Sequence, residues 1–276
     1  MVKMTHLLPK ALKAHAPRGR VDEETRSGDA PETGAWSSAG AAFAPMRLNA
    51  YGAKSPWEIV DVDRSRYEET VALIALAFAG DPLFRYLSGA QGATYRRHIR
   101  ALVEMELTLH LAGGQPLYGI LQGGSLLGVA VVEEPGARRA YGAGIKMAAQ
   151  LWRQTGPLVL LRSLRHLLRI SAHRPREPHH RLSLLAVHPR AQGQGYGKAL
   201  LAEVHARVAA HPTSRGTSLD TENPRNVPLY EHLGYHVTHR IAAGPLTIWS
   251  MLRPREAGRR TGTESRPYSL RGAGRR

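Results

Sequence analysis

The segment Gln-Gly-Gln-Gly-Tyr-Gly, at residues 192–197, closely follows an apolar, strand-like run that ends at Val187. Glycines let a backbone come close to a ligand, and this segment contains Gly193, Gly195 and Gly197. Consecutive N–H groups at the start of a helix, together with the helix dipole, bind phosphate. Arg190 and Lys198 flank the turn with positive charge. The segment therefore predicts a phosphate cradle; the plainer alternative is a glycine-rich turn that binds nothing.

Other phosphate and metal signatures are missing from the sequence. No G-x-x-x-x-G-K-[ST] pattern occurs, and the dinucleotide pattern G-x-G-x-x-G is absent from this turn. The 14 histidines include no H-E-x-x-H motif, and His173, His179 and His180 lie in a proline-rich stretch. We therefore expect surface histidines and no metal site. The chain has no cysteine, which excludes disulfides and a catalytic thiol.

A second group of reactive side chains lies within residues 219–235. Asp220 and Glu222 are carboxylates near the end of an expected strand, and Tyr230 is a phenol that can donate a proton without first being charged. Each has a structural alternative. Either carboxylate can be a solvated turn charge, Tyr230 can be a core aromatic, and Asn226 can be a helix N-cap.

Hydrophobic periodicity and turn residues predict the elements that carry these groups. We expect strands at 57–62, 117–121, 126–132, 182–187, 217–221, 235–240 and 246–252. We expect helices at 67–78, 95–111, 144–154, 158–170, 195–210 and 227–233. Gly123-Gly124 predicts a hairpin, and Asp81-Pro82 is expected to end the first helix.

Length and composition indicate how the chain is divided into a domain and terminal segments. It has 276 residues, a net charge of +16 and 42% hydrophobic residues. The longest apolar run, Val71–Ala79, is too short for a membrane span, which needs about 20 residues. We expect a disordered, basic low-complexity extension at 1–55, one domain at 56–253 and a disordered arginine-rich tail at 254–276. Without a secretory signal or cysteine, a cytoplasmic location is expected.

Positive charge is concentrated in residues 136–180, which carry a net charge of +8. Within residues 143–170 the leucines at 160, 161, 164, 167 and 168 share one side of a helix, and the arginines at 162, 165 and 169 lie largely opposite. We expect the leucines to pack on the core and the arginines to face solvent. A membrane-surface helix and a nucleic-acid-binding face are the alternatives.

The two motif regions resemble those of the GNAT acetyltransferases. Residues 192–197 fit the family pattern Q/R-x-x-G-x-G/A after a strand, and Asn226, Tyr230 and Gly234-Tyr235 fit N-x-x-x-Y-x-x-x-G-[FY]. The resemblance covers about 57–253 and is densest after 173, where it is closest to puromycin N-acetyltransferase-like enzymes. It implies the α/β GNAT fold, a mixed and largely antiparallel central sheet flanked by helices in an α-β-α sandwich, with the motif strand splayed from the next.

The resemblance also implies acetyl-CoA as acyl donor, with no metal. The pyrophosphate would lie on the cradle amides, and the pantetheine arm would follow the preceding strand at a bulge. The expected cofactor contacts are Leu185, Ala186, Val187, Gln192, Gly193, Gln194, Gly195, Tyr196, Gly197, Lys198, Asn226 and Tyr230. The Leu185 amide would polarise the thioester carbonyl, and Tyr230 would protonate the leaving thiolate.

The general base is expected among the acidic residues. Asp220 is preferred because the resembled enzymes carry an acidic residue at that position. Glu222 is the alternative beside it, and Glu104 and Glu106 are weaker candidates.

We therefore expect an N-acetyltransferase that moves an acetyl group from acetyl-CoA to a small-molecule primary amine by direct attack in a ternary complex. Its expected partners are these two substrates, with no specific nucleic acid and no membrane, and the chain is expected to be a monomer or homodimer. A protein N-terminal or lysine acetyltransferase is one alternative. A non-catalytic acyl-CoA sensor or a basic nucleic-acid-binding module is the other.

Overall fold

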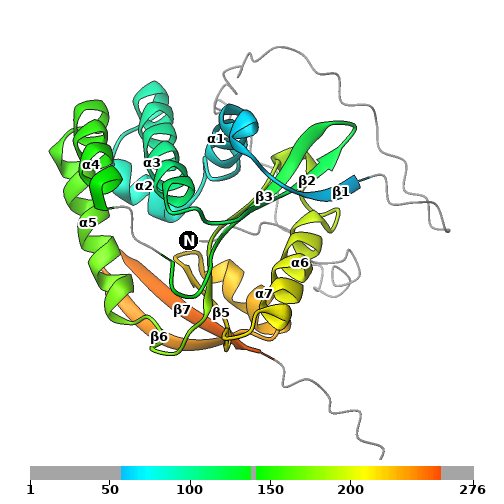
Figure 1. Cartoon of the computed structure of the whole chain (residues 1–276). Coiled ribbons are helices and arrows are strands. Elements are labelled where there is room, and N and C mark those ends of the chain that lie inside the picture. The colour runs from blue at the N-terminus through cyan, green and yellow to red at the C-terminus, as the bar shows by residue number, and fades with distance from the viewer. Residues whose placement is uncertain (1–56, 138–140, 256–276) are drawn as a thin grey trace, which may run out of the picture.

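A computed structural model describes residues 57–137 and 141–255 of the chain, and its strands form a single seven-stranded sheet (Figure 1). The strands are β1 (Trp57–Asp61), β2 (Leu117–Gln122), β3 (Ser125–Glu133), β4 (His180–Val187), β5 (Gly216–Thr221), β6 (His236–Ala243) and β7 (Leu246–Pro254). Their order is β1-β2-β3-β4-β5-β7-β6, and every pair is antiparallel except β4–β5. The expected mixed and largely antiparallel sheet is confirmed.

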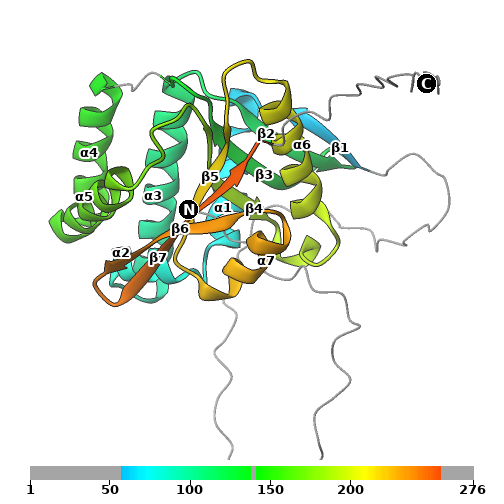
Figure 2. The ribbon, with the colours of Figure 1, turned by 90° about the horizontal axis from the view of Figure 1, so that it is seen from below.

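The helices cover both faces of this sheet. They are α1 (Tyr67–Ala77), α2 (Pro82–Ser88), α3 (Gly92–Ala112), α4 (Tyr141–Thr155), α5 (Pro157–Ala172), α6 (Tyr196–Ala210) and α7 (Val227–His232). One hydrophobic cluster joins α1, α2 and α3 to the sheet, and a second joins α6 and α7 to its other face. Figures 1 and 2 show α1 and α3 on the side of the sheet opposite α6.

The parallel strands β4 and β5 separate early. Only three residue pairs hold them together, ending at Leu182 and Leu219, so the rest of β4 has no strand partner on that side within the described residues. On the other side, adjacent β3 residues pair with Leu182 and Leu184, which leaves Ser183 as an extra residue. An extra residue of this kind is a β-bulge, which bends its strand. The splay and the bulge expected in the motif strand are both present.

Helix α2 differs from the sequence prediction. Asp81-Pro82 was expected only to end a helix, and α1 does end at Ala77, but the same dipeptide also begins α2. The Asp81 carboxylate accepts a hydrogen bond from the Leu83 N–H at 2.9 Å. Proline occupies the first turn, where no N–H is needed. The pair thus ends one helix and caps the next.

Helices α4 and α5 form a hairpin inserted between β3 and β4, and they lie outside α3 at the edge of the molecule (Figures 1 and 2). The prediction that the leucines pack on the core is wrong for most of them. The inner side of α5 carries Val159, His166 and Ile170, which are buried. The outer side of the hairpin, here called the leucine face, consists of Ile145, Trp152, Leu158, Leu161, Leu164, Leu167 and Leu168, all exposed.

Arg162 explains why the hairpin is oriented in this way. Its guanidinium donates to the Tyr86 carbonyl at 3.1 Å and lies 5.6 Å from the centre of the Tyr86 ring. The arginine expected to face solvent therefore attaches α5 to α2, and the leucines on the opposite side turn outward.

The segments at 1–55 and 254–276, which were expected to be disordered, lie almost entirely outside the described residues. At the boundary, β7 runs to Pro254, and the Arg255 side chain donates to the His211 carbonyl at 2.7 Å. Across 57–137 and 141–255, no single helix has the length and apolar composition of a membrane span. The helical segments Arg64–Ala77 and Pro82–Ser88, bent by 98°, pass that test only when taken together.

Candidate active site

The turn between β4 and α6 has the backbone geometry of an anion cradle. Gly193 and Gly195 have φ angles of 80° and 90°, a region in which a side chain is strained. The Ala199 N–H donates to the Gly195 carbonyl at 3.0 Å. The N–H groups of Gly197 and Lys198 lie before this first hydrogen bond of the helix and have no acceptor within it. They therefore point out of the N-terminal end of α6. These amides and the helix dipole favour a phosphate at the turn.

The side chains of the turn have mostly structural contacts. Gln192 donates from Nε2 to the Val187 carbonyl at 3.0 Å, and Gln194 donates to the Arg190 carbonyl at 3.1 Å. Tyr196 is buried, and its hydroxyl donates to Gln122 Oε1 at 3.2 Å. A ligand at this turn would therefore meet its backbone and the exposed Arg190 and Lys198 side chains.

The free edge of β4 presents backbone groups to the gap between β4 and β5. The His188 N–H donates to the Leu127 carbonyl of β3 at 2.8 Å. Because backbone N–H groups alternate in direction along a strand, the Ala186 N–H also points toward β3. The N–H groups of Leu185 and Val187 then face the other way, toward the gap. Leu185, Ala186 and Val187 are all buried. The residues expected to contact the donor thus form an unpaired edge ending at the cradle.

Tyr230, on α7, is fully buried, and its hydroxyl has no hydrogen-bond partner in the described part of the chain. Its ring packs edge-on against Tyr235, with centroids 5.6 Å apart. Burial raises the pKa of Tyr230 well above its ordinary value, and the nearby Asp81 charge acts in the same direction. The phenol therefore keeps its proton at physiological pH and can donate it.

Asn226 is buried beside the end of β5. Its side-chain amide donates to Thr221 Oγ1 at 3.3 Å. The alternative that Asn226 caps the following helix is wrong, because its side chain makes no cap hydrogen bond to α7. The capping residue nearby is Asn223, which accepts from the Arg225 N–H at 3.1 Å.

Asp220 is buried and held on two sides. Its Oδ1 accepts from Ser250 Oγ at 2.6 Å, and its Oδ2 lies 3.5 Å from the Arg181 guanidinium. Arg181 also bonds to Glu133 at 3.0 Å. Asp220 therefore belongs to a buried network that links β3, β4, β5 and β7. It is not a solvated turn charge.

Glu222 lies two residues further along, just after the end of β5, and is also buried. Its Oε1 is 3.3 Å from His166 Nε2 on α5, in a geometry short of a hydrogen bond. Burial raises the pKa of Glu222 to about 8, and the carboxylates of Asp81 and Asp220 add to the rise. Burial likewise lowers the pKa of His166 to about 4. Both groups are thus driven toward their neutral forms near pH 7.

Sequence reasoning missed His166 and Asp81 as parts of this site. His166 is surrounded by leucines in the sequence, and its burial beside Val159 and Ile170 depends on which side of α5 faces inward. The expectation of surface histidines is wrong for His166 and also for His180, whose Nδ1 lies 2.8 Å from Ser214 Oγ. Within the described ranges, no group of three or more potential ligands could hold a metal ion. The weaker base candidate Glu104 forms an ion pair with Arg100 at 2.7 Å.

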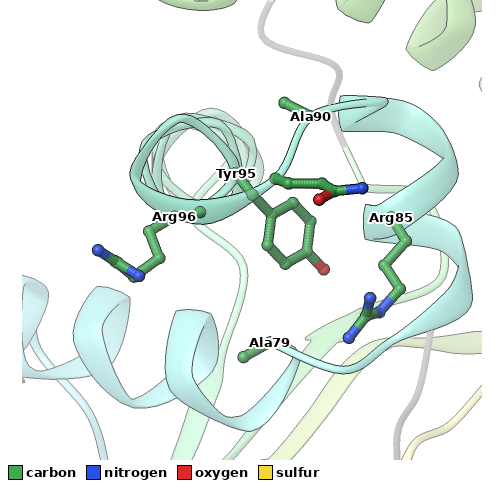
Figure 3. Close-up of a pocket in the computed structure, with 7 residues that line it drawn as sticks. Ala79, Arg85, Ala90, Tyr95 and Arg96 are labelled. Carbon is green, nitrogen blue, oxygen red and sulfur yellow. The ribbon is translucent and has the colours of Figure 1, made fainter. Parts of the chain in front are cut away.

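A separate cavity of about 470 Å³ lies between the end of α1, α2 and the start of α3 (Figure 3). Its lining residues are Ala79, Arg85, Ala90, Gln91, Gly92, Tyr95 and Arg96. The Tyr95 hydroxyl points toward Arg85, whose guanidinium lies 5.8 Å from the Tyr95 ring centre (Figure 3). None of the residues of the β4–β5 gap lines this cavity.

Comparison with known proteins finds similarity in the part of the chain that contains the β4–β5 gap and the turn before α6. Residues 166–237, which contain β4, the cradle, β5 and α7, match a family model described as an acetyltransferase (GNAT) domain. A structure of histone acetyltransferase HPA2 and related acetyltransferase from Corynebacterium glutamicum is similar at 22% identity and a TM-score of 0.56, over 72% of this chain and 96% of that one. Arylalkylamine N-acetyltransferase 2 from Aedes aegypti is similar at 13% identity and a TM-score of 0.51, over 72% and 99%.

These likenesses bear on the fold, and the matched family model covers the elements that form the gap and the cradle. The acyl donor of that family is acetyl-CoA. Residues 166–237 therefore match a GNAT acetyltransferase domain, and this match supports assignment of the chain as an acyltransferase.

Proposed function

We propose that the protein is an N-acetyltransferase that transfers the acetyl group of acetyl-CoA to a small-molecule primary amine. The observation that carries this proposal is a set of buried polar atoms without hydrogen-bond partners in the described residues: Tyr230 Oη on α7, Glu222 Oε1 after β5 and His166 Nδ1 on α5. Glu222 lies 3.3 Å from His166, and the charge of Asp81 acts on both Glu222 and Tyr230. Buried polar groups are normally paired, so such a set calls for a ligand or a functional role.

The donor would bind along β4. The cradle amides from Gln192 to Gly197 and the exposed Lys198 would hold the pyrophosphate, and the pantetheine arm would complete the unpaired edge of β4. The Leu185 N–H would donate to the thioester carbonyl. A donor of this kind typically contributes about 2.7–4 kcal/mol of transition-state stabilisation. Asn226 would support the arm near Tyr230 from the end of β5.

The reaction needs two proton transfers, one to the leaving thiolate and one from the attacking amine, and we assign them to different residues. The neutral amine attacks the thioester carbon, a C–N bond forms and the C–S bond breaks. Tyr230 gives its proton to the departing thiolate. The proton lost by the amine goes to Glu222, whose pKa of about 8 suits proton transfer near neutral pH. Asp220 was the preferred base from sequence. Because Ser250 and Arg181 already engage it, we assign it to orienting the site, with Glu222 as base.

The acceptor side supports an amine substrate. The carboxylates of Asp81 and Asp220 lie close enough to raise the pKa of Glu222, and negative charge of this kind attracts an ammonium ion before it loses its proton. α5 lies against the same region through His166, so a small acceptor fits the proposal better than a polypeptide. The likeness of residues 173–178 to puromycin N-acetyltransferase-like enzymes supports the same class.

The experiment is a panel of acceptors at fixed acetyl-CoA, read by thiol release. Polyamines, arylalkylamines, amino-sugar and aminonucleoside antibiotics represent small amines; peptides with a free N-terminus or lysine represent polypeptides. We expect turnover with at least one small amine and loss of that turnover in Tyr230→Phe. Turnover with peptides alone would move the acceptor class to proteins. Acetyl-CoA binding without turnover of any acceptor would favour a sensor.

A further inference from the structure

The leucine face is an unusual feature of the surface. Every large hydrophobic side chain that is strongly exposed in the described residues lies on α4 or α5. Ile145 is 76% exposed, Leu168 70% and Trp152 57%. Single exposed apolar residues need no explanation, but seven large ones on one helical hairpin mark a surface that contacts something else.

The orientation of α5 is fixed by its polar side. Arg162 bonds to the main chain of α2, and His166 lies against Glu222, so these groups occupy the inner side of the helix. α5 could not rotate its leucines inward without breaking both contacts. The leucine face is therefore held outward by specific interactions, and its exposure is a built property of the fold.

The charged residues of the hairpin are of one sign. No acidic residue occurs between Glu134 and Glu177, a stretch that contains the whole hairpin. Lys146, Arg153 and Arg165 are exposed on it. Aliphatic and tryptophan side chains bordered by lysine and arginine are the composition of helices that lie in the interface of an anionic bilayer. Their long basic side chains reach the lipid phosphates while the apolar groups enter the acyl boundary.

The same charges disfavour a second copy of the chain as the occupant. Two leucine faces packed together would place the cations of both copies side by side with no acidic residue of either hairpin to neutralise them. We therefore propose that α4 and α5 dock the enzyme, through the leucine face, on the surface of an anionic lipid bilayer. This develops the membrane-surface alternative for these helices and departs from the expectation of no membrane partner. The contact is peripheral, because the helices lie in the plane of the surface and do not cross it.

The test is cosedimentation of the full-length protein with vesicles of phosphatidylcholine alone and of phosphatidylcholine with phosphatidylglycerol in equal amounts. We expect at least about tenfold tighter binding to the anionic vesicles. The decisive variant is Trp152→Ser/Leu161→Ser/Leu168→Ser, which keeps every charge of the chain, including those of both terminal segments. It should lose about tenfold or more in binding, because the apolar contribution is removed. Its melting temperature should match the wild type, since the replaced side chains are exposed.

Two further readouts separate the possible occupants. Lys146→Gln/Arg153→Gln/Arg165→Gln should weaken binding to the anionic vesicles and leave the weak binding to neutral ones unchanged. Tryptophan emission of the wild type should shift to the blue with anionic vesicles and be quenched by brominated lipid, and the serine variant, which lacks Trp152 and keeps the other three tryptophans, should show neither effect. Equal vesicle binding by wild type and the serine variant would overturn the proposal, as would absence of binding. A dimer that the serine variant dissociates, without vesicle binding, would assign the face to a second copy.

Discussion

His166 Nε2 and Glu222 Oε1 lie 3.3 Å apart, and they join an inserted helix to the end of a central strand. α5 supplies the histidine, and the segment after β5 supplies the carboxylate. Asp220 lies close enough to act electrostatically on both members of the pair, and the charge of Asp81 acts on both Glu222 and Tyr230. The insertion between β3 and β4 is therefore part of the candidate active site as well as of the outer surface.

The first prediction concerns stability and pH. The raised pKa of Glu222 means that the folded state binds a proton that the unfolded state releases between pH 4.5 and 8, so stability falls as pH rises through that range. The lowered pKa of His166 has the opposite effect between pH 4 and 6.5. The effects of Glu222 and His166 on stability oppose each other below pH 6.5. Between pH 6.5 and 8, only the decrease in stability due to Glu222 remains.

The free energy of unfolding of the wild type should therefore decrease by roughly 1–2 kcal/mol between pH 6.5 and 8 because of Glu222, and Glu222→Gln should not show this decrease. Urea unfolding at half-unit pH steps measures this directly. Glu58→Gln is the control, since it alters an exposed glutamate on β1. Parallel pH curves for wild type and Glu222→Gln would show that Glu222 titrates normally in the folded protein.

The second prediction concerns the rate. With an acceptor amine that is already neutral at pH 7, kcat/KM of the wild type should rise as pH passes through about 8 and Glu222 ionises. Glu222→Gln should reduce kcat by about 10²–10⁴ and remove this rise. Asp220→Asn should retain the rise even if its rate is lower. If instead Asp220→Asn abolishes the rise and Glu222→Gln keeps it, the base is Asp220.

The third prediction tests the acid. Tyr230→Phe keeps the buried ring and removes the proton, so kcat should fall by about 10²–10⁴ while acetyl-CoA affinity stays nearly constant. Tyr235→Phe is the matched control, because that hydroxyl lies next to Tyr230 but is already paired with His205 Nε2 at 2.9 Å. Equal kcat in the two variants, with chemistry rate-limiting, would make Tyr230 a packing residue only.

The fourth prediction tests the cradle. Gly195→Asp adds strain and negative charge at the N-terminal end of α6, so acetyl-CoA should no longer raise the melting temperature. Gly124→Asp is the control for strain. Gly124 also has a positive φ, 80°, with open space around its Cβ position, but it lies in the β2–β3 turn. A normal ligand-induced shift in Gly195→Asp would exclude the turn as the phosphate site.

The fifth prediction separates two arginines of α5. Arg162→Ala should destabilise the protein by about 1–2 kcal/mol, because it removes the bonds to the main chain of α2. Arg165→Ala should change stability by less than about 0.5 kcal/mol, because Arg165 is exposed. Thermal unfolding of both variants gives the comparison. Equal loss in the two would mean that the Arg162 contacts contribute no net stability.

Most of the fold could be predicted because its signals are local. Every strand and six of the seven helices follow from periodicity and turn residues, and the cradle follows from the glycines between β4 and α6. The splay and the bulge were expected from family likeness. Neither could have come from periodicity, because strand separation depends on partners far along the chain.

The missing parts of the site are those that tertiary contacts decide. α5 carries leucines on more than one side, so its sequence alone does not specify the inner face. Arg162 and His166 specify it through α2 and Glu222. Asp81 was read as a helix terminator because Asp-Pro gives the same local signal whether or not a new helix begins after it.

The early separation of β4 from β5 has a consequence for cooperativity. Within residues 57–137 and 141–255, strand pairing links the β1–β4 half of the sheet to the β5–β7 half through three residue pairs, from His180–Thr217 to Leu182–Leu219. Amide protons at this junction should thus exchange by local opening more readily than those inside either half. A donor molecule lying along β4 would fill the seam and bridge both halves. Substrate binding should then slow amide exchange at this junction more than inside either half.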